Sequence, residues 1–226
     1  MTPVQTRIRS VVSQLPPSTR LVAVSKFHPA QAIMEAYDAG QRLFGESRAQ
    51  ELEPKAKSLP ADIQWHFIGH LQTNKVKQVL PYVSCIESVD SERLLLGIDR
   101  QSALMGRVTD VLLQFHIAAE TTKTGFTREE CLAFLASPAF ARVTSVRVTG
   151  VMGMATATDD MERVRREFRS LKAIFDELKG TVFAGNDGFR EISMGMSHDW
   201  PVAVEEGATL VRVGTAIFGE RDYTKR

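Results

Sequence analysis

Two groups of residues at opposite ends of the sequence have the chemistry of a small-ligand site. Lys26 ends the apolar run 21–26, and Gly214 and Thr215 close a second apolar run near the C-terminus. A desolvated lysine favours its neutral amine, which is the nucleophile that forms an imine with an aldehyde or ketone. Glycine allows close approach to the backbone and threonine adds a hydroxyl donor, which suits a phosphate. We predict that both groups face one small phosphorylated ligand.

Lys26 can be interpreted in two ways. It follows Val22 and Val24 at a period of two, so the three side chains share one face of a predicted strand. If that face points into the fold, the ammonium group lies beside apolar walls at the end of the strand. The alternative is a lysine that has emerged into solvent where the strand ends.

Arg212 lies two residues before Gly214, on the same predicted strand face. A buried arginine is rarely unpaired, so it needs a carboxylate, a carbonyl or a ligand atom. One candidate partner is a ligand at the Gly214 end of the strand. The alternative is an internal salt bridge with a glutamate such as Glu46.

The histidines and cysteines do not have metal-binding spacing. His66 and His70 are four residues apart but lie on either side of a predicted strand end, so they do not form a helical pair. Cys85 and Cys131 are far apart and too few for a disulfide scaffold. We predict buried thiols and no metal site.

Strand-like and helix-like patterns alternate along the chain, and this alternation must position the polar residues. Helical patterns separate the predicted strands, and the clearest is 159–179; a further short helix is predicted over 4–14. Eight strand candidates are found, at 21–26, 43–46, 65–69, 83–89, 111–118, 147–154, 191–195 and 209–214. This order predicts an α/β fold, a single (β/α)₈ TIM barrel with an extra N-terminal helix. A doubly wound open sheet is the alternative, but no glycine-rich fingerprint follows the first strand.

Active sites of such barrels lie at the C-terminal ends of the strands. Lys26, Ser47, the stretch 193–197 and the pair Gly214-Thr215 all fall at predicted strand ends. Glycines and hydroxyls dominate there, which favours a phosphate site over a metal site.

Composition excludes several classes of protein. The 226 residues are 43% hydrophobic and 24% charged with a net charge of +1, values of an ordinary globular domain without a nucleic-acid footprint. No apolar run reaches the roughly 20 residues of a membrane span, and the first residues lack the apolar core of a secretory signal. We therefore expect one domain over residues 1–226, in the cytoplasm, with no nucleic-acid or membrane partner.

Five motifs in order resemble the pyridoxal phosphate homeostasis proteins of the YggS/PROSC type. The similarity runs from about residue 20 to Tyr223. The motifs are Ala23-Val24-Ser25-Lys26, Trp65-His66-Phe67-Ile68-Gly69, Leu71-Gln72-Thr73-Asn74-Lys75, Ser193-Met194-Gly195-Met196-Ser197 and Val211-Arg212-Val213-Gly214-Thr215-Ala216-Ile217-Phe218-Gly219.

The resemblance implies a barrel like the N-terminal domain of alanine racemase, with pyridoxal 5′-phosphate (PLP) held as an aldimine on Lys26. It further implies phosphate contacts from Ser193 or Ser197 and from Gly214-Thr215, with Arg212 beside the pyridine nitrogen. The chain departs from the family where Gly-Glu-Asn-Tyr is usual, because it has Gly45-Glu46-Ser47-Arg48. Ser47 is therefore carried over as a cofactor contact that is shorter than the usual asparagine contact, or lost.

The resemblance and the residues together predict a PLP carrier rather than an enzyme. A cation beside the pyridine nitrogen disfavours its protonation and weakens the ring as an electron sink. Only a few residues follow Phe218-Gly219, so we expect no added β-domain to supply a second base. We expect a monomer that buffers PLP or delivers it to apo-enzymes, with no catalytic residues.

Three alternatives remain open. The first is a fold-type III PLP-dependent amino-acid racemase or lyase. The second is a Schiff-base aldolase acting on sugar phosphates, because a lysine and a phosphate site would serve that reaction too. The third is a catalytically silent barrel that acts only through protein contacts.

Overall fold

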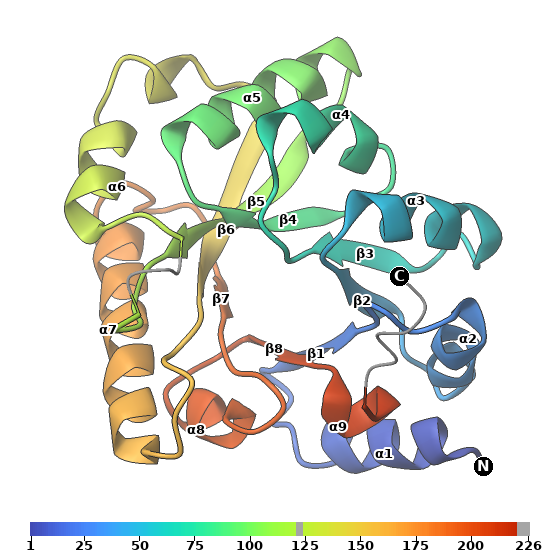
Figure 1. Cartoon of the computed structure of the whole chain (residues 1–226). Coiled ribbons are helices and arrows are strands. Elements are labelled where there is room, and N and C mark those ends of the chain that lie inside the picture. Colours follow the sequence, from blue (N-terminus) through green and yellow to red (C-terminus); the bar gives the residue numbers. More distant parts are fainter. Residues whose placement is uncertain (121–123, 221–226) are drawn as a thin grey trace.

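The computed structural model describes residues 1–120 and 124–220, and in them eight parallel strands close into a barrel (Figure 1). Each strand pairs with the next along the chain, and the last pairs with the first. The strands are β1 (Arg20–Val24), β2 (Leu43–Glu46), β3 (Gln64–Phe67), β4 (Cys85–Val89), β5 (Thr109–Phe115), β6 (Val146–Gly153), β7 (Glu191–Ser193) and β8 (Leu210–Val213). The predicted TIM barrel is confirmed, and the alternative prediction of a doubly wound open sheet is wrong.

Helices follow the strands and cover the outside of the barrel (Figure 1). They are α1 (Pro3–Val12), α2 (Ala30–Asp38), α3 (Ala49–Ser58), α4 (Val76–Val79), α5 (Glu92–Leu104), α6 (Arg128–Leu135), α7 (Met161–Gly180), α8 (Trp200–Glu205) and α9 (Thr215–Phe218), with short 3₁₀ turns at Thr73–Lys75 and Phe140–Arg142. The helical segment between β3 and β4 therefore consists of a 3₁₀ turn followed directly by α4.

The predicted N-terminal helix is present as α1. The hydroxyl of Thr2 accepts a hydrogen bond from the backbone N–H of Gln5, and the Gln5 side chain accepts one from the backbone of Thr2. Val4, Ile8 and Val11 are buried at helical spacing. Their face packs α1 against α2 and α9, so the start of the chain supports the element that follows β8.

Helix α7 shows why the helical pattern predicted this part of the fold well. Its N-cap Asp160 accepts a hydrogen bond from the backbone N–H of Arg163. Phe168 and Leu171 are completely buried. Burial of each such side chain stabilises the fold by about 1.5–3 kcal/mol.

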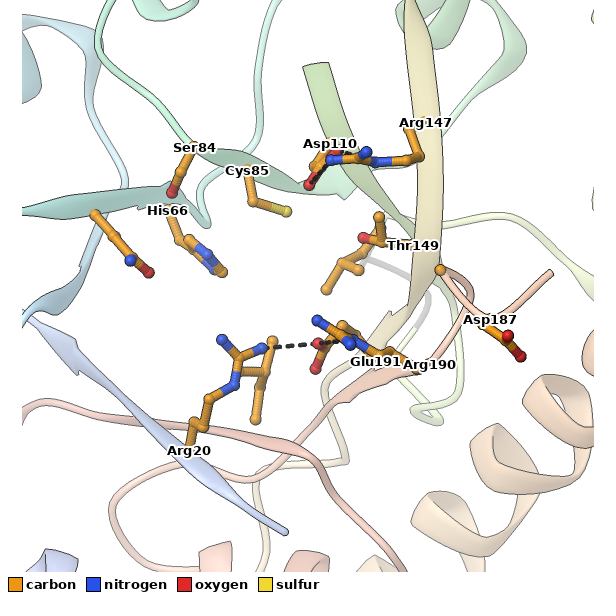
Figure 2. Close-up of a pocket in the computed structure, with 14 residues that line it drawn as sticks. Arg20, His66, Ser84, Cys85, Asp110, Arg147, Thr149, Asp187, Arg190 and Glu191 are labelled. Atoms are coloured by element: carbon orange, nitrogen blue, oxygen red, sulfur yellow. Dashed lines mark hydrogen bonds and ion pairs between the residues drawn. The ribbon is translucent and has the colours of Figure 1, made fainter. Parts of the chain in front are cut away.

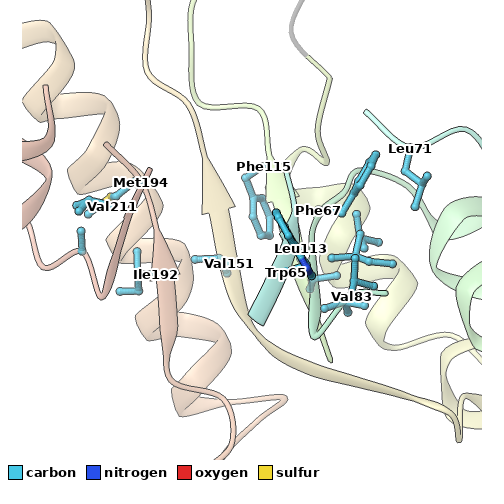
Figure 3. Packing of buried hydrophobic residues seen from close by; sticks show 14 of the residues in the cluster. Trp65, Phe67, Leu71, Val83, Leu113, Phe115, Val151, Ile192, Met194 and Val211 are labelled. Atoms are coloured by element: carbon cyan, nitrogen blue, oxygen red, sulfur yellow. The ribbon is translucent and has the colours of Figure 1, made fainter. Parts of the chain in front are cut away.

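Strand residues alternate between the inside of the barrel and the layer under the helices. The inner side chains form a small apolar cluster of Val22, Leu43, Cys85, Leu112, Met152 and Leu210. The outward side chains belong to the large core between strands and helices; Figure 3 shows Trp65, Phe67, Leu113, Phe115, Val151 and Val211 among them. Both cysteines are buried free thiols, as predicted.

The strand ends differ from prediction at the position that matters most. The apolar pattern predicts the first strand over 21–26, but β1 ends at Val24 and Lys26 lies in the turn beyond it. Beyond Val24, the backbone N–H of His28 donates to the carbonyl of Ser25 at 3.1 Å, which closes a turn. Lys26 therefore does not share a strand face with Val22 and Val24.

Candidate functional site

The turn that carries Lys26 lies at the C-terminal rim of the barrel. Lys26 is half-buried, so it is neither in the core nor fully in solvent. The next residue, Phe27, has a φ of 67°, and it is the one non-glycine residue in the described part of the chain with a positive φ. The Phe27 backbone N–H donates to Glu51 Oε2 at 2.7 Å. The turn thus has a specific, strained geometry.

Strand β8 places Gly214 beside the turn of Lys26. The register of β1 and β8 pairs Val22 with Arg212 and Ala23 with Val213, so Gly214 follows next to Val24. A Cβ on Gly214 would lie 3.2 Å from the carbonyl oxygen of Val24, which leaves little room for a larger residue. The rings of His28 and Phe218 stack with centroids 5.1 Å apart, which joins the Lys26 turn to α9.

Hydrogen-bond donors gather where β8 leads into α9. The hydroxyl of Ser197 accepts from the backbone N–H of Gly214 at 3.2 Å and from that of Ala216 at 3.4 Å. Thr215 is exposed between them. The structure therefore brings Ser197, Gly214 and Thr215 together, as an anion site would require.

Arg212 lies below this rim, inside the barrel, and is 4% exposed. Its Nη1 donates to Ser193 Oγ at 2.6 Å and its Nη2 donates to the carbonyl of Gly153 at 2.9 Å. The nearest carboxylate is Glu87, whose Oε2 lies 3.9 Å from Nη1. Burial lowers the pKa of Arg212, and the negative charge of Glu87 opposes that shift. The guanidinium nevertheless remains a cation, because its ordinary pKa is so high.

Glu87 connects Arg212 to His66. Its Oε2 accepts from the Ser193 hydroxyl at 2.5 Å, and its Oε1 lies 2.6 Å from His66 Nδ1. Burial alone would raise the pKa of Glu87, but hydrogen bonds from His66 and Ser193 and the positive charge of Arg212 together lower it. The result is a buried hydrogen-bonded chain through the barrel: Arg212, Ser193, Glu87 and His66.

The internal salt bridge considered for Arg212 is present, but its partner is Glu87 and not Glu46. Glu46 points away from the barrel interior, because Gly45 beside it is the residue that faces inward against Val22 and Ile68. The Glu46 carboxylate instead accepts from Lys55 Nζ at 2.7 Å, under α3. Glu87 is the carboxylate that faces Arg212.

Two of the predicted residues differ in position from the rest. Ser193 is completely buried, with its hydroxyl bonded to both Arg212 and Glu87, so it lies in the interior chain and apart from the Ser197 group. Ser47 is half-buried at the end of β2, where its backbone packs against Gly69. A Cβ on Gly69 would lie 2.3 Å from the Ser47 carbonyl, so the glycine is needed for this contact.

Sequence reasoning missed Glu87 and His66. Glu87 lies in the strand Cys85–Val89, in which every residue is buried. A carboxylate within a buried strand always needs a partner, and that signal was available in the sequence.

An opening lies at the N-terminal end of the barrel, opposite the rim that carries Lys26 (Figure 2). It is a polar cavity of about 450 Å³, with His66 and Cys85 among the residues that line it. Arg20 pairs with Glu191 at 2.7 Å and Arg147 with Asp110 at 2.6 Å across its wall. None of the predicted site residues lines this cavity.

The residues at the C-terminal rim fit PLP by their chemistry. An amine in Lys26, backbone N–H groups and hydroxyls around Gly214, and a cation in Arg212 match an aldehyde, a phosphate and a ring nitrogen respectively. Within residues 1–120 and 124–220 no group of three or more histidine, cysteine, aspartate and glutamate side chains could hold a metal ion. Within the same residues no helix is long and apolar enough to cross a membrane.

Comparison with known proteins agrees with this chemistry. Residues 3–222 match the family described as the alanine racemase N-terminal domain. The pyridoxal phosphate homeostasis protein of Aquifex aeolicus is 39% identical over 205 residues, which cover 90% of this chain and 88% of that protein.

Solved structures show the same similarity. PipY of Synechococcus elongatus without PLP is 40% identical, with a TM-score of 0.89, and the match covers 96% of this chain and all of that one. PipY with PLP bound is likewise 40% identical over the same shares of both chains, with a TM-score of 0.85. With an eight-stranded barrel, a lysine turn beside Gly214 and these relatives, the chain belongs to the pyridoxal phosphate homeostasis protein family, whose fold is that of the alanine racemase N-terminal domain.

Proposed function

We propose that this protein binds PLP at the C-terminal rim of the barrel and serves in PLP homeostasis, by buffering the cofactor or delivering it. One observation carries the proposal: the Lys26 turn and the Ser197–Gly214 group lie on adjoining strands, β1 and β8, of one barrel. A relative with the same fold has been solved with PLP bound, which supports the choice of cofactor.

Each residue of the rim has a distinct role in this proposal. The bound cofactor supplies an aldehyde, and the amine of Lys26 is the group that links to it covalently. The hydroxyls of Ser197 and Thr215, beside the backbone N–H groups of Gly214 and Ala216, would hold the phosphate. Ser47 lines the rim on the β2 side.

Arg212 and Ser193 act from below. Arg212 keeps its positive charge and its position through Ser193, Gly153 and Glu87. A cation facing the pyridine nitrogen of bound PLP would disfavour a proton there, and would therefore weaken the ring as an electron sink. This favours a carrier over a racemase or lyase, and no catalytic residue is assigned.

We propose a single PLP-binding domain over residues 1–226 that works as a monomer, since Lys26, Ser197, Arg212 and Gly214 all come from one chain. The two buried free thiols fit a reducing compartment, which supports a cytoplasmic location. Apo-enzymes that require PLP are the proposed recipients.

An absorbance spectrum of the protein with added PLP tests the function. We expect a band shifted from that of free PLP, and borohydride should fix the cofactor to Lys26. Lys26→Ala should abolish both signals, whereas Lys57→Ala, which changes an exposed lysine of α3, should keep both. The proposal fails if wild type and Lys26→Ala give the same spectrum, or if neither gives a shifted band. Turnover of any amino acid in a broad panel would favour the racemase or lyase instead.

A further inference from the structure

The turn of Lys26 is held from outside the barrel by residues of a single stretch, 46–55. Four of them contact the turn or support such a contact: Glu46, Arg48, Glu51 and Lys55. We call these four residues the clamp. The contacts involve both neighbours of Lys26, so the clamp acts on the backbone that carries the lysine.

Lys55 is the centre of the clamp. Its Nζ donates to the Ser25 carbonyl at 2.9 Å, to Glu46 Oε1 at 2.7 Å and to Glu51 Oε2 at 3.3 Å. An ammonium has three N–H donors, so all three are used. The Lys55 side chain is 11% exposed. Its positive charge offsets the repulsion between the two neighbouring carboxylates.

The two carboxylates hold the residues on either side of Lys26. Glu46 Oε1 also accepts from the hydroxyl of Ser25 at 2.6 Å. Glu51 Oε2 also accepts from the backbone N–H of Phe27 at 2.7 Å. Ser25 and Phe27 flank Lys26, so its backbone is fixed before and after the reactive side chain.

Phe27 shows why the turn needs such support. Its φ of 67° is the left-handed conformation that the third position of a type II turn requires and that glycine normally supplies. A bulky residue persists in this conformation only when its surroundings impose it. The Glu51 hydrogen bond fixes the Phe27 backbone, and the Arg48 guanidinium lies 4.5 Å from the centre of the Phe27 ring.

Arg48 connects Phe27 and Glu51. Its guanidinium lies over the Phe27 ring, and its Nη1 lies 3.8 Å from Glu51 Oε1.

We propose that Lys55, Glu51, Glu46 and Arg48 are positioning residues that hold the Lys26 amine in the geometry needed to link to PLP. This inference rests on the proposed function. Lys55 acts through the turn and does not itself bind the cofactor, because its three donors are occupied within the clamp. Loss of the clamp therefore leaves Lys26 present but misplaced.

The chain offers a matched pair of variants for the test, Lys55→Met and Lys57→Met. Both lysines are on α3, but Lys57 pairs with Glu53 in solvent, at 2.8 Å, and is 62% exposed. We expect Lys55→Met to slow formation of the covalent link to PLP on the order of ten- to a hundredfold, because misplaced reacting groups lose that much rate. Lys57→Met should react at the wild-type rate.

A second readout uses the protein without PLP. Competitive acetylation compares the reactivity of Lys26 with that of the exposed Lys77 in the same molecule. We expect the ratio of the two rates to differ from wild type in Lys55→Met and to be unchanged in Lys57→Met. A purely structural role of Lys55 would lower the denaturation midpoint but would leave this ratio, and the linking rate of the folded protein, unchanged.

If Lys55→Met does not fold, variants of Glu51 test the same proposal. Its side chain is 21% exposed, and Glu53, at 44%, is the matched control. Glu51→Ala should slow linking, Glu51→Gln should restore much of the rate because an oxygen still accepts from Phe27, and Glu53→Ala should have no effect. Wild-type rates in both Lys55→Met and Glu51→Ala would overturn the clamp while leaving the PLP proposal intact. Absence of linking in wild type would instead overturn the proposed function.

Discussion

The guanidinium of Arg212 and the carboxylate of Glu87 lie 3.9 Å apart inside the barrel, and the hydroxyl of Ser193 bridges them. The hydroxyl accepts from the cation and donates to the anion, so both charges are solvated by one buried group. Two opposite charges can remain in a low-dielectric interior only when they are paired and hydrogen-bonded in this way. The position of Arg212 under the rim therefore depends on β4 and β7 as much as on its own strand.

The first prediction concerns the stability of this group. Arg212→Met removes the cation that faces the buried Glu87, and should lower the free energy of unfolding by about 3–5 kcal/mol. Ser193→Ala removes only the bridging hydroxyl and should cost about 1–3 kcal/mol. Denaturant unfolding of both variants measures the difference.

A double variant provides the control. Arg212→Met combined with Glu87→Gln should be more stable than the sum of the two single losses implies, because it leaves no buried charge behind. Strict additivity would show that the two residues are not coupled.

The second prediction is a pH dependence that depends on Glu87. The folded pKa of Glu87 lies below its ordinary value of 4.5, so the unfolded state binds the proton more readily. The contribution of Glu87 is therefore present above pH 4.5 and is lost as the pH falls below 4.5. We expect the difference in unfolding free energy between wild type and Glu87→Gln to be largest near neutrality and to shrink below pH 4.5.

The third prediction has the opposite sign and concerns Glu46. Burial raises the pKa of Glu46 above 4.5, although Lys55 and the Ser25 hydroxyl oppose the shift. The folded state now binds the proton more readily, so this contribution is present below pH 4.5 and is lost as the pH rises through the raised folded pKa. Relative to Glu46→Gln, wild type should lose stability as the pH rises from 4.5. If the stability differences between wild type and Glu46→Gln and between wild type and Glu87→Gln changed with pH in the same direction, the opposite pKa shifts of the two glutamates would be contradicted.

The pattern of apolar runs predicts the barrel and its rim, but it does not predict which glutamate pairs with Arg212. The barrel and the placement of Lys26, Ser197 and Gly214 at one rim follow from apolar runs and from the rule that sites lie at strand ends. The partner of Arg212 did not follow, because Glu46 and Glu87 are both glutamates of buried strands. Inward-facing Gly45 places Glu46 on the outside, and only the register of the closed barrel shows this.

The end of β1 could not be predicted because it depends on contacts distant in sequence. The pattern of Val22, Val24 and Lys26 continues the period of two beyond the true strand end. The turn is decided instead by Glu51 and Lys55, which bind the backbone on either side of Lys26 from α3. The β-propensity of the residues in the strand cannot predict such contacts.

The fourth prediction separates phosphate binding from binding of the ring. Ser197→Ala removes a hydroxyl at the N–H groups of Gly214 and Ala216, and should weaken PLP binding roughly tenfold or more, as expected for a hydrogen bond to a charged group. Pyridoxal, which lacks the phosphate, should bind wild type and Ser197→Ala equally. Absorbance titration measures both, and His198→Ala, at the exposed neighbouring position, is the matched control. An equal loss for both ligands would place the phosphate elsewhere.

The last prediction concerns Ser47, where the family usually has asparagine. Ser47 is half-buried at the end of β2, and a serine hydroxyl reaches less far than an asparagine amide. If the position faces the cofactor, Ser47→Asn adds one hydrogen bond, worth about 0.5–1.5 kcal/mol, and should tighten PLP binding roughly two- to tenfold. Ser47→Ala should have little effect, because the shorter hydroxyl makes little or no contact. Equilibrium titration with PLP measures both variants, and an unchanged affinity in Ser47→Asn would show that this side chain does not face the bound cofactor.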